Sequence, residues 1–356
     1  MQFPGQGKPP LGIIFDTVMG KSIDEALALA LLYGFDGKNE SRLISVSLSN
    51  PDLPAAAFCD VVGHFYAGAI DPQFQAFVRG LPIGLSMDRK VPSEESAMLT
   101  GPLAKPGYTS GIKKWNDTAE PVPLIRNAFT SQYDQNCVAV LAGPATNLVK
   151  VLDLPGTREL IAAKVRYLSV LTTEFNLKTD LASAKRLFAE WPTPIFAVGT
   201  DIWDAVPFPA SSIEKDFAWS TAHPIVDAYR AYKPMPYDAP TWAMAAVLYA
   251  VRPKEGYFKL SGPGVIAVLD DGRTKFTPSA EGKHQRLIFD PLQKDRILKV
   301  YTEIASAKPV PRQPRQQKKE DLPKAPEAKP SEVKPSEVKA GDTNSKDGKP
   351  AEAKPN

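Results

Sequence analysis

A strand, a turn and a helix near the N-terminus constrain the fold more than any other part of the sequence. Residues 12–15 are apolar and partly β-branched, which is typical of a buried parallel strand, and Asp16 falls where that strand would end. Gly20 then allows the chain to turn, and Asp24 and Glu25 occupy the first turn of an Ala/Leu-rich helix, where the helix dipole favours carboxylates. Ligands bind at the carboxyl ends of the strands in open α/β sheets, so this turn is the first candidate site.

The alternation of strand and helix continues along the chain. Apolar runs predict further strands at residues 42–48, 82–84, 137–141, 165–171 and 195–198. Helical patterns occupy residues 54–69, 123–133, 181–191, 222–232, 241–251 and 291–306, and residues 257–290 predict short antiparallel strands. We expect the long connection at residues 86–121 to lie near the same rim. The order of elements predicts an α/β domain at residues 11–306, with a doubly wound, mostly parallel (mixed) open sheet.

The two ends of the chain differ in composition from this domain. Many of the 35 prolines fall in residues 307–356, which contain no aromatic residue and few large aliphatic ones. Such a segment cannot bury enough apolar surface to fold, so we predict a disordered Lys/Pro/Glu-rich tail at 307–356 and a flexible N-terminus at 1–10. Interleaved charges in the repeat at 329–339 keep a linker extended and soluble, and we expect no nucleic-acid partner.

The cysteines and the hydropathy of the sequence indicate the cellular compartment of the protein. Cys59 and Cys137 lie in apolar sequence without metal-ligand spacing, which predicts two buried free thiols rather than a disulfide. Residues 1–10 have no apolar core of signal-peptide length, and no run of about 18 apolar residues occurs in the sequence. We therefore expect no membrane partner and, by default, a cytoplasmic protein.

Five segments of this chain resemble, in the same order, motifs of the inosine–uridine-preferring nucleoside hydrolase family. They are the stretch that begins at Gly12, Gly143-Pro144-Ala145-Thr146-Asn147-Leu148, Glu174-Phe175-Asn176, residues 188–195 and residues 246–253. The resemblance covers about residues 11–306 and implies a nucleoside-hydrolase-like fold. It also implies hydrolysis of the N-glycosidic bond between ribose and a base, with a Ca²⁺ ion that holds ribose hydroxyls and the attacking water.

The chain departs from that family at the residues that bind calcium. The subgroup it most resembles opens with Asp-Thr-Asp-Met-Gly-Asn-Asp-Val-Asp-Asp, whereas residues 16–25 here read Asp-Thr-Val-Met-Gly-Lys-Ser-Ile-Asp-Glu. Val18 replaces an aspartate that the resemblance implies is both a metal ligand and the base, and Ala243 replaces another ligand. Because Ca²⁺ takes about six to eight oxygen ligands, we expect its site to be lost or weak and hydrolysis to be impaired or absent.

Several polar residues at the predicted strand ends remain candidates for a site. The candidate catalytic residues are Asp16 and Asp24, and the same two with Glu25 are the metal ligands if a site survives. By the resemblance, the candidate substrate-binding residues are Asn50, Glu174, Phe175 and Asn176. Structural alternatives stay open, because Asn is common in turns, strand ends carry polar caps, and a carboxylate complements a helix N-terminus.

Lys21 lies in the loop that would wrap the ion. Its ammonium could supply part of the cation's charge beside Asp16 or Asp24, or it could be an exposed loop lysine. Two functions remain open. One is an active N-ribohydrolase that uses an altered metal site or metal-free acid/base chemistry through Asp16, Asp24 or Glu174, and the other is a non-catalytic ribose-binding, nucleoside-binding or scaffold protein. The expected ligand is a small nucleoside or ribose-like molecule, and assembly into a homo-oligomer is compatible with both.

Overall fold

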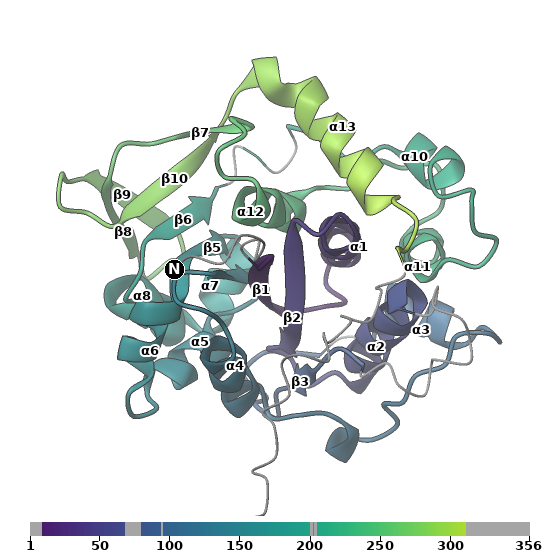
Figure 1. Cartoon of the computed structure of the whole chain (residues 1–356), viewed down its shortest axis with the longest axis horizontal. Coiled ribbons are helices and arrows are strands. Elements are labelled where there is room, and N and C mark those ends of the chain that lie inside the picture. Colours follow the sequence, from purple (N-terminus) through teal and green to yellow (C-terminus); the bar gives the residue numbers. More distant parts are fainter. Residues whose placement is uncertain (1–8, 68–79, 94, 200–201, 203–204, 311–356) are drawn as a thin grey trace, which may run out of the picture. The chain divides into compact units, whose positions relative to one another are not determined.

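The computed structural model describes residues 9–67, 80–93, 95–199, 202 and 205–310. One mixed sheet runs through it (Figure 1). Its strands are β1 (Leu11–Thr17), β2 (Ser41–Leu48), β3 (Ile83–Leu85), β4 (Cys137–Ala142), β5 (Val165–Leu171), β6 (Ile195–Val198), β7 (Phe258–Leu260), β8 (Gly264–Val268), β9 (Thr274–Pro278) and β10 (His284–Phe289). They lie in the order β3-β2-β1-β4-β5-β6-β10-β8-β9, and β7 pairs with β10. The pairs from β3 to β6 and the β6–β10 pair are parallel, whereas β7, β8 and β9 pair antiparallel. The predicted doubly wound, mostly parallel, mixed sheet is confirmed.

Helices connect the strands close to the predicted positions. They are α1 (Ile23–Gly37), α2 (Leu53–Ala67), α3 (Ala97–Leu103), α4 (Pro121–Thr130), α5 (Thr146–Leu152), α6 (Thr157–Lys164), α7 (Glu174–Thr179), α8 (Leu181–Glu190), α10 (Ala210–Lys215), α11 (Pro224–Tyr232), α12 (Trp242–Val251) and α13 (Lys294–Ala305). Two short 3₁₀ turns, η2 (Trp115–Asp117) and η3 (Pro291–Gln293), accompany them. The sequence pattern missed the short helices α3, α6, α7 and α10, which have too few turns to show a clear period.

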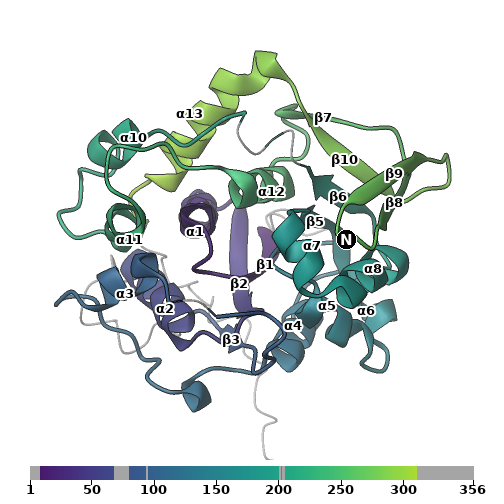
Figure 2. The same cartoon turned by 180° about the vertical axis from the view of Figure 1, so that it is seen from behind.

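The sheet separates two apolar cores because alternate residues of a strand point to opposite faces. In β1, Ile13 and Phe15 pack into one core and Ile14 into the other. Helices α1, α2, α11, α12 and α13 cover the first face, and α4, α5, α6 and α8 cover the second (Figures 1 and 2). The central strands are therefore apolar on both faces, which explains their continuous apolar runs.

The start of α1 is built as the sequence predicts. Gly20 adopts a positive φ of 113°, a conformation that favours glycine. Ser22 is the N-cap residue and forms a capping box with Glu25, so two backbone amides at the helix start gain acceptors. The helix is buried on nearly every side, and its Ala/Leu composition lets it pack closely against α12 and α13.

The long connection after β3 is tied down by two carboxylates. Asp60 of α2 accepts hydrogen bonds from the Ser110 hydroxyl at 2.8 Å and from the Gly111 amide at 2.7 Å. Asp227 of α11 accepts from the Tyr108 hydroxyl at 2.7 Å and pairs with the Lys105 ammonium at 2.7 Å. These bonds hold the connection against two helices of the same face.

Other expectations concern the thiols and the chain ends. Cys59 and Cys137 are free and buried, as predicted. The predicted flexible N-terminus and disordered tail lie almost wholly outside the described residues, except for residues 9–10 and 307–310. No described helix is long and apolar enough to cross a membrane.

The close approach of α1 and α13 gives the first prediction. A Cβ on Gly34 would lie 2.0 Å from the backbone oxygen of Ile304, which cannot move independently of α13. We expect Gly34→Ala to lower the free energy of unfolding by about 1–3 kcal/mol or more in urea titrations, because overpacking forces backbone shifts. The control is Gly262→Ala, whose Cβ would meet no heavy atom within 4 Å. Equal stability of the two variants would contradict this packing.

Candidate functional site

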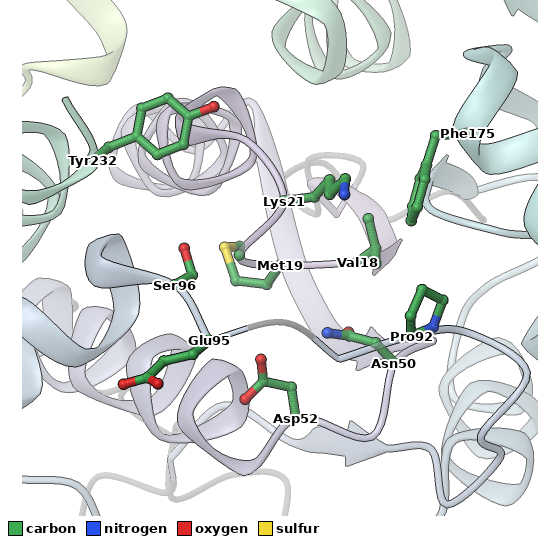
Figure 3. A pocket seen from close by; sticks show the side chains of 11 residues that line it. Val18, Met19, Lys21, Asn50, Asp52, Pro92, Glu95, Ser96, Phe175 and Tyr232 are labelled. Atoms are coloured by element: carbon green, nitrogen blue, oxygen red, sulfur yellow. The ribbon is translucent and has the colours of Figure 1, made fainter.

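A cavity of about 200 Å³ opens at the carboxyl ends of β1 and β2 (Figure 3). Its walls come from the β1–α1 loop, the β2–α2 turn, the long connection after β3, and helices α7 and α11. The lining residues are Val18, Met19, Gly20, Lys21, Asn50, Asp52, Pro92, Glu95, Ser96, Phe175 and Tyr232. The rim that the sequence singles out therefore carries the candidate site.

One wall of the cavity is polar and comes from the end of β2. Asn50 is only 4% exposed, and its side-chain oxygen has no hydrogen-bond partner among the described residues. Its amide points into the cavity, and the Asp52 carboxylate faces the same space (Figure 3). Leaving a buried acceptor unpaired costs about 1–3 kcal/mol. The Asn50 nitrogen is the polar atom that this side chain directs into the cavity (Figure 3).

The opposite part of the cavity is mostly apolar. Val18 and Met19 are almost fully buried where the β1–α1 loop reaches the cavity. The Lys21 ammonium lies 4.7 Å from the centre of the Phe175 ring, which is a cation–π geometry. Tyr232 adds a second aromatic ring from the end of α11 (Figure 3).

Asp16 lies at the end of β1, outside the cavity lining. One carboxylate oxygen accepts from the Ser47 hydroxyl at 2.5 Å and from the Asn147 amide at 2.9 Å. The other oxygen has no partner among the described residues. Burial raises the pKa of Asp16 to about 7, because only neutral donors offset the loss of water. Asp16 thus joins β1, β2 and α5.

The Asp24 carboxylate is directed at the N-terminus of α12. It accepts from the backbone amide of Ala243 and, at 3.3 Å, from that of Met244. Burial raises the pKa of Asp24 to about 7, although these amide donors oppose the rise. Asp24 therefore serves as an acceptor for a helix N-terminus that lacks a side-chain cap of its own.

The Glu25 carboxylate is bound by its own loop. One oxygen accepts from the backbone amides of Gly20 at 2.8 Å, Lys21 at 3.0 Å and Ser22 at 3.3 Å. Burial raises the pKa of Glu25 well above its ordinary value, while these amides act in the opposite direction. The N–H groups of the β1–α1 loop thus point inward at the Glu25 side chain.

The Glu174-Phe175-Asn176 triplet begins α7, and its three side chains diverge. Phe175 alone of the three lines the cavity. Glu174 is exposed and pairs with Lys178 one helical turn later. Asn176 is buried and donates to the backbone oxygen of Leu171 at 3.4 Å. Of these three residues, which the resemblance implies for substrate binding, only Phe175 lies in the cavity lining.

Lys21 does not take the position expected of a counter-charge. Among the described ion pairs none joins Lys21 to Asp16 or Asp24, and its ammonium lies over Phe175 instead. The reason is the direction of the two carboxylates. Asp16 faces Ser47 and Asn147 within the sheet edge, and Asp24 faces α12, so neither is turned toward the outer side of the loop.

Several solved structures are similar to this chain, although the sequence matches no family model and no curated protein sequence. The inosine-uridine preferring nucleoside hydrolase from Bacillus anthracis aligns with 83% of this chain and 99% of its own, at 16% identity and a TM-score of 0.61. The plant nucleoside hydrolase PpNRh1 aligns with 84% and 100%, at 18% identity and a TM-score of 0.60. The type III effector protein XopQ, solved with adenosine diphosphate ribose, aligns with 85% and 96%, at 11% identity and a TM-score of 0.61.

The chain has the nucleoside hydrolase fold. The predicted resemblance is confirmed at the level of the fold, since these identities are too low to carry an activity across. The cavity lies at the rim of this fold where the β1–α1 loop, the β2–α2 turn and α7 meet.

The side chains of this chain that could serve as metal ligands do not fit a calcium ion. No group of three or more His, Cys, Asp or Glu side chains that could hold a metal occurs in the described part of the chain. Glu25 is engaged by three loop amides and Asp24 by two amides of α12, while the side chain of Val18 offers no oxygen. Asp16 keeps one unpaired oxygen, far short of the about six to eight that Ca²⁺ takes.

Sequence reasoning missed several residues of the cavity. Asp52 follows the end of β2 by a few residues, and the rule that ligands bind at the carboxyl ends of strands could have found it. Pro92, Glu95 and Ser96 belong to the connection at residues 86–121, which the sequence predicts to lie near this rim, although no motif singles them out. Tyr232 carries no such signal, because it reaches the rim only through the packing of α11.

Asp16→Asn tests the buried carboxylate through pH. Because burial raises the folded-state pKa of Asp16 from 3.8 to about 7, the folded protein binds this proton more tightly than the unfolded chain does. The Asp16 contribution to stability is therefore complete below about pH 4 and is lost as pH rises through about 7. We expect wild-type unfolding free energy to fall more steeply between about pH 5 and 7 than that of Asp16→Asn, by up to about 1.4 kcal/mol per pH unit.

Urea titrations at several pH values measure this difference. The matched control is Asp153→Asn, since Asp153 is an exposed carboxylate that pairs with Arg186. Its slope should follow that of the wild type. Parallel slopes for wild type and Asp16→Asn would contradict the raised pKa.

Proposed function

We propose that the rim cavity takes a nucleoside or its ribose moiety, and that hydrolysis of the N-glycosidic bond by this chain is impaired or absent. The fold supports the first part, because nucleoside hydrolases share it and the cavity lies at its ligand-binding rim. The second part rests on one observation. Carboxylates that could bind a metal are instead bound by backbone amides.

Hydrolysis of a glycosidic bond requires a water molecule directed at the anomeric carbon and a base to take its proton. In the nucleoside hydrolase family, as the resemblance implies, an aspartate at the position of Val18 supplies that base. Val18 presents only methyl groups, and the carboxylates that line the cavity are Asp52 and Glu95 on the opposite wall (Figure 3). The loss of a general base lowers rates by about 10²–10⁴-fold.

The lining of the cavity supports a ligand with a polar face and an apolar face. Asn50 and Asp52 supply an amide and a carboxylate, and Phe175 and Tyr232 supply two aromatic rings. Among structures of this fold, XopQ was solved with adenosine diphosphate ribose, which contains ribose. A nucleoside has both a polar and an apolar surface, because its sugar carries hydroxyl groups and its base is an aromatic ring.

An assay with inosine and uridine tests both parts of this proposal. We expect release of free base at least about 10²-fold slower than by the Bacillus anthracis enzyme assayed alongside, with no change on addition of Ca²⁺ or of a chelator. The melting temperature should likewise be unaffected by Ca²⁺ and should rise with nucleoside, because a ligand that binds the folded state stabilises it by mass action.

Two results would overturn the proposal. Release of base that a chelator abolishes would restore calcium-dependent hydrolysis. A melting temperature unchanged at saturating concentrations of both nucleosides would remove the ligand-binding part.

A further inference from the structure

A second cavity lies at the other end of β2, between the C-terminal ends of α1 and α2. Its volume of about 320 Å³ falls within the about 300–1,000 Å³ that is typical of small-molecule sites. Leu43, near the start of β2, lines this cavity, whereas Asn50, beyond the end of β2, lines the rim cavity. Because a strand rises about 3.3 Å per residue, these two residues lie about 20 Å apart. The second cavity is therefore separate from the candidate site.

Most of the wall of this second cavity is apolar or aromatic. Tyr33 of α1 and Tyr66 of α2 line it, and their rings stack with centroids 4.8 Å apart and planes at 4°. Aliphatic side chains complete the wall: Leu43, Ile44, Leu81, Pro82, Pro309 and Val310. Such a wall favours a ligand with an apolar body, and the faces of aromatic rings attract a cation.

One carboxylate lies in this wall, at the end of α1. Asp36 is 8% exposed, and one of its oxygens accepts from the Leu43 amide at 3.2 Å, which helps to fix the side chain. A carboxylate has about four acceptor positions, so it can accept from a ligand as well as from this amide. The last turn of α1 contains no basic residue, and the C-terminus of a helix favours a cation.

The charged groups around Asp36 also favour a cation. His64 lines the cavity, and its Nδ1 lies 3.5 Å from the Oδ2 atom of Asp60. Lys38 follows α1, and its ammonium pairs with Glu303 at 3.7 Å. Among the lining residues that the structure describes none is Lys or Arg. An anion in this cavity would therefore be repelled by Asp36, and a cation would be attracted.

We propose that this second cavity binds a small organic ammonium ion with an apolar body. The apolar body packs among the aliphatic side chains, and the ammonium donates hydrogen bonds to Asp36 close to the tyrosine rings. A cation gains a charge-assisted hydrogen bond and a cation–π attraction that a neutral ligand of the same shape lacks. This inference goes beyond the proposed function, because both the site and the class of ligand are different.

The test compares three probes of similar shape that differ in charge. Phenethylamine is a cation at neutral pH, 2-phenylethanol is neutral, and phenylacetate is an anion. Their binding to the full chain is measured by calorimetry. We expect phenethylamine to bind at least about tenfold more tightly than 2-phenylethanol, and phenylacetate to bind more weakly than either.

Asp36→Asn removes the charge and keeps an oxygen that can accept from the Leu43 amide. This variant should bind phenethylamine about tenfold or more weakly than the wild type does and should leave 2-phenylethanol unchanged. The matched control is Asp153→Asn, which removes an exposed carboxylate that pairs with Arg186 and should bind all three probes as the wild type does. Asp52→Asn removes a carboxylate of the rim cavity and should leave the binding of phenethylamine unchanged. Melting temperatures without ligand report whether each variant is folded.

Three outcomes would overturn the inference. Equal affinity of the wild type for phenethylamine and 2-phenylethanol would exclude recognition of a cation, and this comparison decides the question even if Asp36→Asn does not fold. Binding of phenethylamine that Asp52→Asn abolishes and Asp36→Asn retains would place the amine at the rim cavity. No binding of any probe up to its solubility limit would exclude the second site.

Discussion

The hydrogen bonds from the backbone amides of Gly20, Lys21 and Ser22 to Glu25 determine the polarity of the site. A loop that binds a cation turns oxygens toward it, and this loop turns N–H groups toward a carboxylate. N–H groups that hold a carboxylate cannot also coordinate a cation. Glu25 thus fixes the turn that starts α1, and the direction of α1 places the next carboxylate, Asp24, against the amides of α12.

The contact between Asp24 and α12 depends on the small residue at its first turn. Ala243 is fully buried and its own amide donates to Asp24, so a larger side chain would separate the two helices. The positive end of the α12 dipole favours the carboxylate that approaches it. Ala243 therefore has two effects. Its side chain offers no oxygen ligand to a metal, and its small size allows the hydrogen bond between its backbone amide and Asp24 that holds α1 to α12.

Much of the fold could be predicted from the sequence, because buried parallel strands are apolar on both faces and end in polar turns. The family resemblance selected Asn50 and Phe175, which both line the cavity. It also selected Glu174, which is exposed and pairs with Lys178. The sequence contains the sign of this pair, because Lys178 follows four residues later, the spacing of an ion pair on a helix. Tyr232 reaches the rim only through packing between distant elements, which no local pattern encodes.

The distribution of charge explains how the rim remains stable with several buried acids. Asp16, Asp24 and Glu25 each turn to a different set of donors: side chains of β2 and α5, amides of α12, and amides of the loop. Three carboxylates that converged on one point without a cation would repel one another and raise each other's pKa further. Because they diverge, and because Val18 and Ala243 are neutral, the cavity itself is left with an apolar wall and one polar wall. The polar wall of the cavity thus lies at the end of β2, where the buried side-chain oxygen of Asn50 has no hydrogen-bond partner within the described part of the chain.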